Sequence, residues 1–365
     1  MPDTFAAVED MLREAVEAHV FPCAVVEVGT SGQVLFSYAA GAHTFDPLAT
    51  IATPETIFDL ASLTKVMATA TLVMRAVDDR RLRLDDPVRA WLSEWQGTDR
   101  ESVTIRDLLA HSSGLPAYLP FFRDHTARRE YQHAICRMPL EYAPGTESIY
   151  SDLGFILLGF ILEDAASGSA GHQGVAGSFD PAASLAGQFQ RFAMFVTDHP
   201  LTFNAPRAWR ARTAPTEIDP WRGRLLTGEV HDENAWALGG AAGHAGLFGT
   251  AAAVAAFARA ILRTMSGEAI VAKPETMRLF ARRTEIPRSS RALAWDTMLP
   301  TSSCGSRLSP TAIGHTGFTG TSLWIDYERD LYVVLLSNRV HPTRQNEMIR
   351  QFRPRLHDAV VEALA

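Results

Sequence analysis

The sequence is poor in lysine. Of the 34 lysine and arginine residues in this chain of 365, only Lys65 and Lys273 are lysines. Arginine stays protonated in nearly every protein environment, whereas lysine can lose its proton when its surroundings favour the neutral amine. A position that keeps lysine in such a chain therefore draws attention, although a base-composition bias of the source genome would produce the same scarcity.

Cysteine and long apolar runs are scarce as well. The three cysteines, Cys23, Cys136 and Cys304, are odd in number, far apart and without a C-x-x-C pair, which argues against a disulfide framework or a zinc site and fits a reducing compartment. No run of about 18 apolar residues is present. Residues 1–20 alternate acidic and apolar residues at helical spacing, unlike a signal peptide. We expect a cytoplasmic protein without a membrane span.

Positive charge is not concentrated anywhere in the chain. The net charge is −7, and no basic block or arginine stripe interleaved with aromatic residues occurs, so nucleic acid is not an expected partner. The hydrophobic content of 47% with 21% charged residues is typical of a globular chain. The length predicts one or two domains.

Strand patterns lie near both ends of the chain and helical patterns lie between them. We expect strands over 24–28, 34–38, 322–327 and 331–336, and helices over 1–20, 62–78, 104–110, 152–164, 250–265, 274–283 and 344–363. Residues 165–187, rich in alanine, glycine and serine, predict a loop. The pattern favours an α+β fold with an antiparallel sheet of about five strands, flanked by N- and C-terminal helices. The domain that contains the sheet would comprise residues 1–60 and 285–365. A mostly helical domain, residues 61–284, would be inserted into it.

The first candidate for chemistry is Ser62 with Lys65. Positions i and i+3 share a helix face, so the serine hydroxyl and the lysine amine can meet, and a lysine with a lowered pKa can activate a serine. Ser62 could instead cap the helix, but a capping box wants Glu or Gln at the third position, and a cation in the first turn opposes the helix dipole. For this pair taken alone, a serine three residues before a lysine could also occur by chance.

Two further segments carry candidate residues. Tyr150-Ser151-Asp152 precedes a helix that is apolar nearly all round, so the phenol could relay a proton there, or Ser151 or Asp152 could be the N-cap. Residues 314–321 (GHTGFTGT) place glycines at three positions of a strand pattern, which indicates close backbone approach or a bulge. An edge strand of this kind could offer a backbone N–H to an acyl oxygen, or the segment could be a glycine-rich hairpin.

The three segments together resemble the serine β-lactamase and penicillin-binding-protein superfamily, most closely its class C-like branch with the family VIII carboxylesterases. The S-x-x-K, Y-x-N and K-T-G motifs of that superfamily correspond in order to Ser62/Lys65, Tyr150/Asp152 and His315/Thr316/Gly317. The segments 108–116 (LLAHSSGLP), 144–146 (PGT) and 243–248 (GHAGLF) match as well. The similarity extends over about residues 20–340 and is weakest at 167–230.

The resemblance implies a cofactor-free hydrolase of β-lactamase/transpeptidase-like fold, with its active site in the cleft between the two domains. Ser62 would attack an acyl carbon while Lys65 and Tyr150 share the proton. The backbone N–H groups of Ser62 and Phe318 would form the oxyanion hole, and water would release the acyl-enzyme. Donors of this kind contribute about 3–4 kcal/mol each in other acyl-transfer enzymes.

Two residues depart from the family pattern. Asp152 replaces the asparagine, and a carboxylate cannot donate a hydrogen bond to a substrate amide. Beside Lys65 it also favours the charged amine and shifts the role of base toward Tyr150. His315 replaces a lysine, so the fixed cation of the third motif becomes a group that is charged only at lower pH. Together with the missing export signal, both changes favour an esterase or small-amide hydrolase.

Other residues carry weaker signals. His231-Asp232-Glu233 and His244 lack metal-ligand spacing, so we expect no metal and instead loop caps or pocket-lining residues. His111 is expected to be a structural hydrogen-bonding histidine, and Lys273, before a proline, a surface residue. Trp209, Trp221 and Trp236 could shape an apolar acyl pocket or belong to the core.

The sequence leaves several functions open. The leading one is a serine hydrolase of carboxylic esters or small amides. The alternatives are a β-lactamase or D-amino-acid peptidase (DD-carboxypeptidase), a non-catalytic penicillin-binding-like sensor, and an acyltransferase in which an alcohol replaces water. The expected partner is a small ester, amide or peptide substrate, and the sequence does not indicate an oligomeric state.

Overall fold

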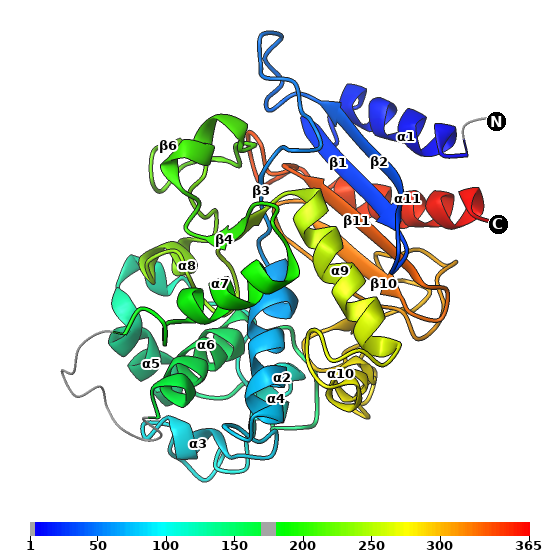
Figure 1. Ribbon diagram of the computed structural model, residues 1–365. Helices are drawn as coiled ribbons and strands as arrows, with labels where there is room; N and C mark the ends of the chain where they lie inside the picture. Colours follow the sequence, from blue (N-terminus) through cyan, green and yellow to red (C-terminus); the bar gives the residue numbers. More distant parts are fainter. Residues whose placement is uncertain (1–3, 169–179) are drawn as a thin grey trace.

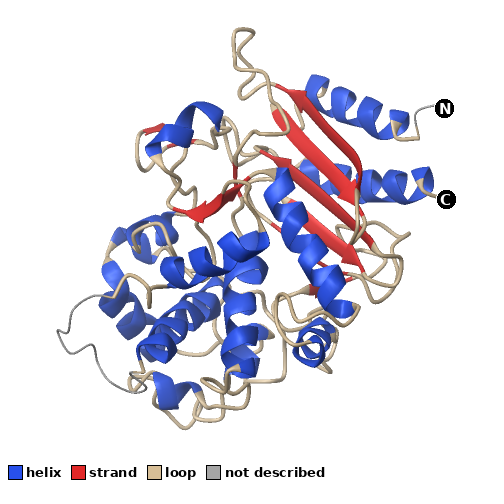
Figure 2. Ribbon diagram, viewed as in Figure 1, coloured by secondary structure: helices blue, strands red, loops and turns tan. Residues whose placement is uncertain are grey.

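A six-stranded antiparallel sheet assembled from both ends of the chain organises the molecule. The computed structural model describes residues 4–168 and 180–365. The strand order is β2-β1-β11-β10-β9-β8, and Figure 2 shows the long strands of this sheet side by side in red. The bounds are β1 Cys23–Gly29, β2 Val34–Gly41, β8 Asp296–Thr297, β9 Ile313–Thr316, β10 Ser322–Asp326 and β11 Leu331–Ser337. The α+β class and the antiparallel sheet are therefore confirmed, and the sixth strand beyond the expected five or so is the two-residue β8.

The centre of the sheet joins the N-terminal hairpin to the C-terminal one. Val26 of β1 is paired with Leu335 of β11 on one side and with Tyr38 of β2 on the other. Every residue of β1 and β11 is buried, since helices cover both faces and the alternate side chains of these apolar strands enter two different cores.

Three helices cover the two faces of the sheet. Helices α1 (Ala6–Glu17) and α11 (Ile349–Ala363) lie side by side on one face, and α9 (Ala251–Met265) lies on the other (Figure 1). The α9 packing on β1 and β11 brings residues of the predicted helical domain to the sheet. The division into 1–60 with 285–365 and 61–284 stays a prediction.

The remaining helices gather on the α9 side of the sheet and below it in Figure 1. They comprise η1 Lys65–Ala70, which is a π-helix continued by α2 Thr71–Asp78, then α3 Val88–Trp91, α4 Ile105–Leu109, η2 Phe121–Arg123, α5 Ala127–Arg137, α6 Asp152–Ser167, α7 Leu185–Val196, η3 Arg207–Arg212, α8 Glu233–Ala237 and α10 Pro274–Ala281. Short strands complete the fold: β3 Phe58–Asp59, β4 Leu201–Phe203, β5 Ile218–Asp219, β6 Arg224–Leu225 and β7 Leu247–Gly249. No helix that the structure describes is long and apolar enough to cross a lipid bilayer.

The predicted elements are all present: most helices are shorter than expected, whereas β1, β2, β11 and α6 are longer. The expected helix over 344–363 begins at Ile349, after a turn that closes on the sheet. Part of the loop expected over 165–187 lies at 169–179, outside the described residues. Its two ends are helical instead, because α6 extends to Ser167 and α7 begins at Leu185, where Ser184 accepts a hydrogen bond from the N–H of Gly187. The helices α3, α5, α7 and α8 and the short helices η2 and η3 were not predicted.

Candidate active site

Ser62 sits on a tight turn between β3 and η1. Ala61, just before it, has a φ of +47°, which costs an L-residue about 1–2 kcal/mol. The turn is held because the N–H of Ala61 donates to Asp59 Oδ1 over 2.8 Å. Ser62 is partly exposed, whereas Lys65 is fully buried in η1. The turn thus presents the serine to solvent and keeps the lysine beneath it.

The Lys65 ammonium joins the first motif to the second. Its Nζ donates to Ser62 Oγ over 3.0 Å, to Asp152 Oδ1 over 2.7 Å and to the carbonyl of His244 over 3.2 Å. It also lies 4.7 Å from the centre of the Tyr150 ring. The Ser62 hydroxyl therefore contacts the lysine rather than capping a helix, and four candidate residues predicted from the sequence meet at one point.

Charges around Lys65 and Tyr150 set the resting protonation state. Desolvation opposes the charge of Lys65, but Asp152 and Tyr150 outweigh it and raise the lysine pKa above its usual value. Burial raises the pKa of the Tyr150 phenol, and Asp152 adds to this, while Lys65 and Ser62 act in the opposite direction. The resting site thus holds a charged lysine and a neutral phenol.

The second motif is fixed by a helix cap and a histidine. Ser151 is the N-cap of α6, because its hydroxyl accepts a hydrogen bond from the N–H of Gly154. The N–H of Ser151 donates to Nδ1 of His111 over 2.9 Å, and the His111 ring lies 4.7 Å from that of Tyr150. Both the N-cap interpretation of Ser151 and the structural role of His111 are confirmed. These contacts fix the backbone on which Tyr150 and Asp152 stand.

The third motif lies where β9 leaves the sheet. The strand is not at the edge as expected, because β8 pairs with Ile313 and Gly314, but His315 and Thr316 stay open on that side. A Cβ on Gly317 would lie 2.7 Å from the carbonyl oxygen of Leu60. The close approach predicted from the glycines is therefore real, and it brings the Gly317–Phe318 peptide against the Ser62 turn.

His315 is neutral in this structure. Its Nδ1 is 2.8 Å from the carbonyl oxygen of Thr316, so this nitrogen carries the proton and Nε2 has the free lone pair. Burial, together with the charges of Arg291 and Lys65, lowers the His315 pKa well below its usual value. The third motif consequently carries no cation at neutral pH.

One cavity of about 390 Å³ contains most of the candidate residues. The lining includes Ser62, Tyr150, His315, Thr316, Gly317 and Phe318, together with Arg291, Asp296, Arg339, Glu347, Ile349, Arg350 and Arg353. None of the three tryptophans considered for an acyl pocket is in this lining; Trp221 and Trp236 are half-exposed and contact each other instead. The described lining is therefore polar and rich in arginine.

The arginines are the site residues that sequence reasoning missed. Arg291 lies 5.1 Å from the centre of the Tyr150 ring, and its guanidinium forms no ion pair with a described residue. Arg339 donates to the Phe318 carbonyl over 2.8 Å, and Arg353 donates to the Gly317 carbonyl over 2.9 Å. The only sequence signal for these arginines was the large excess of arginine over lysine, and this excess does not identify which positions lie in the site.

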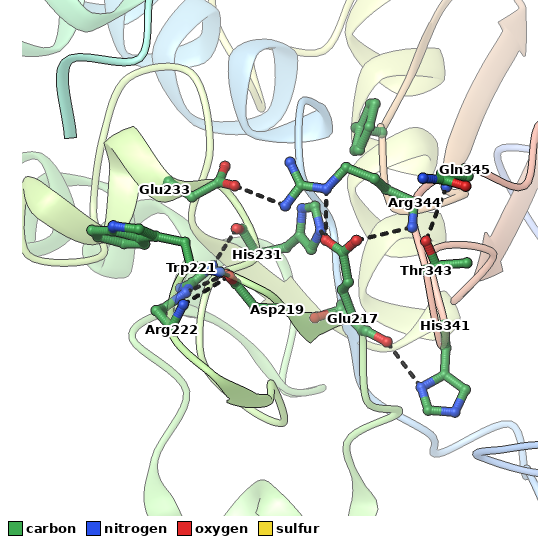
Figure 3. A network of polar contacts seen from close by, with 12 residues as sticks. Glu217, Asp219, Trp221, Arg222, His231, Glu233, His341, Thr343, Arg344 and Gln345 are labelled. Carbon is green, nitrogen blue, oxygen red and sulfur yellow. Dashed lines mark hydrogen bonds and ion pairs between the residues drawn. The ribbon is translucent and has the colours of Figure 1, made fainter. Parts of the chain in front are cut away.

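A polar network centred on Glu217 and Arg344 (Figure 3) reaches the Phe318 segment through His231. Glu217 accepts a hydrogen bond from Arg344 Nε over 2.7 Å and lies 2.9 Å from His231 Nε2. The ring of His231 stacks on Phe318 at 5.7 Å. The backbone N–H of His231 donates to Asp59 Oδ2. The network therefore links the Ser62 turn to the Phe318 segment.

The histidines considered as metal ligands have other partners. Asp232 caps α8 and lies 2.8 Å from His244 Nε2, which confirms the capping interpretation. No group of three or more potential ligands suited to a metal ion occurs within residues 4–168 and 180–365. Lys273, at the start of α10, is exposed as predicted.

Comparison with known proteins identifies the family. The Beta-lactamase family model matches residues 8–354, so the chain belongs to that family of serine hydrolases. A relative from Escherichia coli K12, named "Putative D-alanyl-D-alanine carboxypeptidase", is 29% identical over 310 residues, which cover 80% of this chain and 70% of the relative. The resemblance inferred from the motifs is confirmed.

Solved structures agree on the fold. EstCE1, "a hydrolase with promiscuous acyltransferase activity", is 21% identical with a TM-score of 0.75, covering 98% of each chain. A class C beta lactamase from Rhodobacter sphaeroides is 22% identical with a TM-score of 0.73, covering 98% of this chain and 99% of the other. At such identities the similarity establishes the β-lactamase fold and leaves the substrate open.

Proposed function

We propose that the chain hydrolyses carboxylic esters or small amides through an acyl-enzyme on Ser62. The observation that carries this proposal is the position of the Lys65 ammonium, within hydrogen-bond reach of both Ser62 Oγ and Asp152 Oδ1. The same cavity holds Tyr150 and the third-motif strand. A nucleophile, a candidate base and a fixed charge therefore meet where a substrate can enter.

In the proposed acylation, Ser62 Oγ bonds to the acyl carbon and the carbonyl π electrons move to oxygen. Tyr150 acts in its ionised form: the phenolate takes the serine proton and delivers it to the leaving alkoxide as the carbon–oxygen bond breaks. Lys65, kept charged by Asp152, stabilises this phenolate before it accepts the proton. In deacylation, water attacks the acyl carbon and gives a proton to the Tyr150 phenolate. Tyr150 then returns the proton to Ser62 Oγ as the serine leaves, and the carboxylic acid is released.

The N–H groups of Ser62 and Phe318 form the oxyanion hole in this proposal. Neither donates a hydrogen bond to another residue that the structure describes. Gly317 supports the assignment, because its approach to Leu60 brings the two peptides together. Two such donors aimed at one oxygen are the arrangement that acyl transfer requires.

Esters are the preferred class because of Asp152. Its carboxylate is acceptor-only and already holds Lys65, so it cannot donate to the carbonyl of an amide substrate. An alkoxide also leaves with less help from an acid than an amine does. Turnover of p-nitrophenyl acetate and butyrate by wild type, Ser62→Ala and the exposed-site control Ser93→Ala tests the proposal. We expect activity in wild type and the control only; full turnover by Ser62→Ala would refute the assignment of the nucleophile.

A D-peptidase is the second candidate, and Arg291 is the observation that favours it. Its guanidinium is free of ion pairs with described residues and lies in the cavity beside Tyr150. A guanidinium pairs well with a carboxylate, such as the C-terminus of a D-alanyl peptide. The name of the Escherichia coli relative points the same way.

A matched peptide pair separates the two candidates. D-alanyl-D-alanine peptides with a free and an amidated C-terminus are compared with p-nitrophenyl butyrate, and nitrocefin tests β-lactam turnover. Faster cleavage of the free-carboxylate peptide than of the ester would favour the peptidase. An acyltransferase would convert the acyl-enzyme to a new ester when an alcohol is added, and a sensor would be labelled by a fluorophosphonate without turnover. The cytoplasmic location stays a prediction.

A further inference from the structure

We propose that Thr64 and Arg353 are positioning residues that polarise the two oxyanion-hole peptides from their carbonyl ends. The inference rests on the proposed function, because it concerns the N–H groups of Ser62 and Phe318. Each of these N–H groups belongs to a peptide whose carbonyl comes from the preceding residue, Ala61 or Gly317. Both carbonyls point away from the cavity into hydrogen bonds.

The Ala61–Ser62 peptide is held by Thr64. The Ala61 carbonyl accepts from the Thr64 hydroxyl over 2.6 Å and from the Thr64 N–H over 3.0 Å. Thr64 is fully buried, so water does not compete for this carbonyl. The Thr64 hydroxyl is therefore bonded to the same peptide that would donate to the oxyanion.

The Gly317–Phe318 peptide is also held by two donors to its carbonyl oxygen, and one of them is a charged side chain. The Gly317 carbonyl accepts from Arg353 Nη2 over 2.9 Å and from the Gly320 N–H over 3.1 Å. Arg353 is only 7% exposed. Burial, with Arg339 and Arg350 nearby, lowers its pKa to about 9, which still leaves it charged at neutral pH.

Donors on a carbonyl strengthen the N–H at the other end of the same peptide. They draw electron density toward oxygen, which makes the amide hydrogen more positive, and hydrogen bonds in such a chain reinforce one another. Charge-assisted bonds do so more strongly. When Ser62 Oγ bonds to the acyl carbon and the carbonyl pair moves to oxygen, this extra polarity acts on the charge as it forms. It therefore lowers the barrier without tightening ground-state binding.

Truncating either donor leaves its carbonyl with one remaining backbone donor. Without the Arg353 guanidinium, the Gly317 carbonyl keeps Gly320, and without the Thr64 hydroxyl, the Ala61 carbonyl keeps the Thr64 N–H. The Thr64 hydroxyl also accepts from the N–H of Leu247, so Thr64→Val lowers the melting temperature somewhat. Thr64→Ser retains the hydroxyl and serves as its matched control.

The test measures kcat and KM for p-nitrophenyl butyrate, and the rate of Ser62 labelling by a fluorophosphonate, well below the melting temperature of each variant. Labelling forms the serine oxygen–phosphorus bond and expels fluoride, while the ionised form of Tyr150 takes the serine proton. It needs no deacylation. We expect Arg353→Met and Thr64→Val each to lower kcat and the labelling rate about tenfold, with KM within about twofold. Thr64→Ser and Arg355→Met, which removes an exposed arginine of the same helix, stay near wild type.

Several results would overturn the inference. These are unchanged kcat in folded Arg353→Met or Thr64→Val, a loss confined to KM, or a Thr64→Ser variant as impaired as Thr64→Val. If Arg353→Met does not fold, the two Thr64 variants decide. Slowed labelling in an enzyme that hydrolyses no ester would support the inference and refute the proposed function. Absence of Ser62 labelling in wild type would refute both.

Discussion

Lys65 and Asp152 form a buried ion pair, 2.7 Å between Nζ and Oδ1, directly beneath Ser62. The lysine side chain is fully buried, and that of the aspartate is 17% exposed. Because the pair fixes the lysine in its charged form, the residue that first drew attention as a candidate base is better suited to stabilise charge. Tyr150 is left as the group that takes the serine proton.

Asp152→Asn should move the pH dependence of catalysis. In wild type, kcat/KM for p-nitrophenyl butyrate should rise from pH 7 to 10, because burial raises the pKa of Tyr150 and only its ionised form can take the serine proton. Asp152 raises the pKa of both Tyr150 and Lys65, so its removal should shift the rising limb to lower pH. The new amide should also increase nitrocefin turnover. A pH–rate profile of both proteins checks this, and an unmoved limb would contradict the role of Asp152.

His315→Lys should restore a cation to the third motif. The wild-type histidine is neutral because burial lowers its pKa well below the usual value, so it gives an anionic substrate no charge to bind. We expect nitrocefin turnover to increase about tenfold or more, the effect of one added charge pair in a partly buried site, while p-nitrophenyl acetate turnover changes little. Equal nitrocefin rates in the two proteins would count against the idea that this residue selects against anionic substrates.

Gly317→Ala should damage both stability and activity. A Cβ at this position would lie 2.7 Å from the Leu60 carbonyl oxygen and would also collide with the Thr321 hydroxyl. The strand must move away from the Ser62 turn, at a cost of about 1–3 kcal/mol, and the Phe318 N–H moves with it. We expect kcat to fall about 100-fold or more, measured with chemical denaturation to follow stability. Gly32→Ala is the control, since its Cβ would meet open space and its φ lies outside the left-handed region. Retained kcat in Gly317→Ala would remove Phe318 from the oxyanion hole.

Glu217→Gln should lower the free energy of unfolding most at neutral pH. Desolvation raises the Glu217 pKa, but hydrogen bonds from His231 and Arg344 outweigh it and hold the pKa below its usual value. A lowered folded-state pKa stabilises the fold above the unfolded value of about 4.3 and loses this effect as the pH falls through the folded value. We expect Glu217→Gln to cost about 2–4 kcal/mol at pH 7 and progressively less below pH 4. Melting curves from pH 7 to 3 measure this, and a constant difference across that range would rule out the ionised carboxylate as the source.

The ordered motifs made most of the active site predictable. Ser62, Lys65, Tyr150 and His315 are far apart in sequence, yet the spacing of each motif and its resemblance to the family placed them in one site, and the structure brings them together. Asp152 was correctly expected to favour the charged lysine.

The supporting residues could not be predicted in the same way. Arg291 and Arg353 come from a loop and a C-terminal helix and reach the cavity only through tertiary packing. An arginine in an amphipathic helix normally lies on its solvated face, so nothing in the local pattern marks Arg353 as buried. The edge position expected for β9 was wrong for a related reason: β8 has two residues and leaves no periodic signal.

The pairing of β1 with β11 ties the first strand of the chain to one of the last. Cys23, at the start of β1, is hydrogen-bonded to Asn338, 315 positions later. Such distant pairing makes folding slow. During synthesis, the Ser62 turn emerges long before the Gly317 strand and α11 that complete the site around it. A nascent chain therefore carries a serine without the Phe318 N–H that would complete the proposed oxyanion hole, and under the proposed function it can acquire activity only after α11 has left the ribosome.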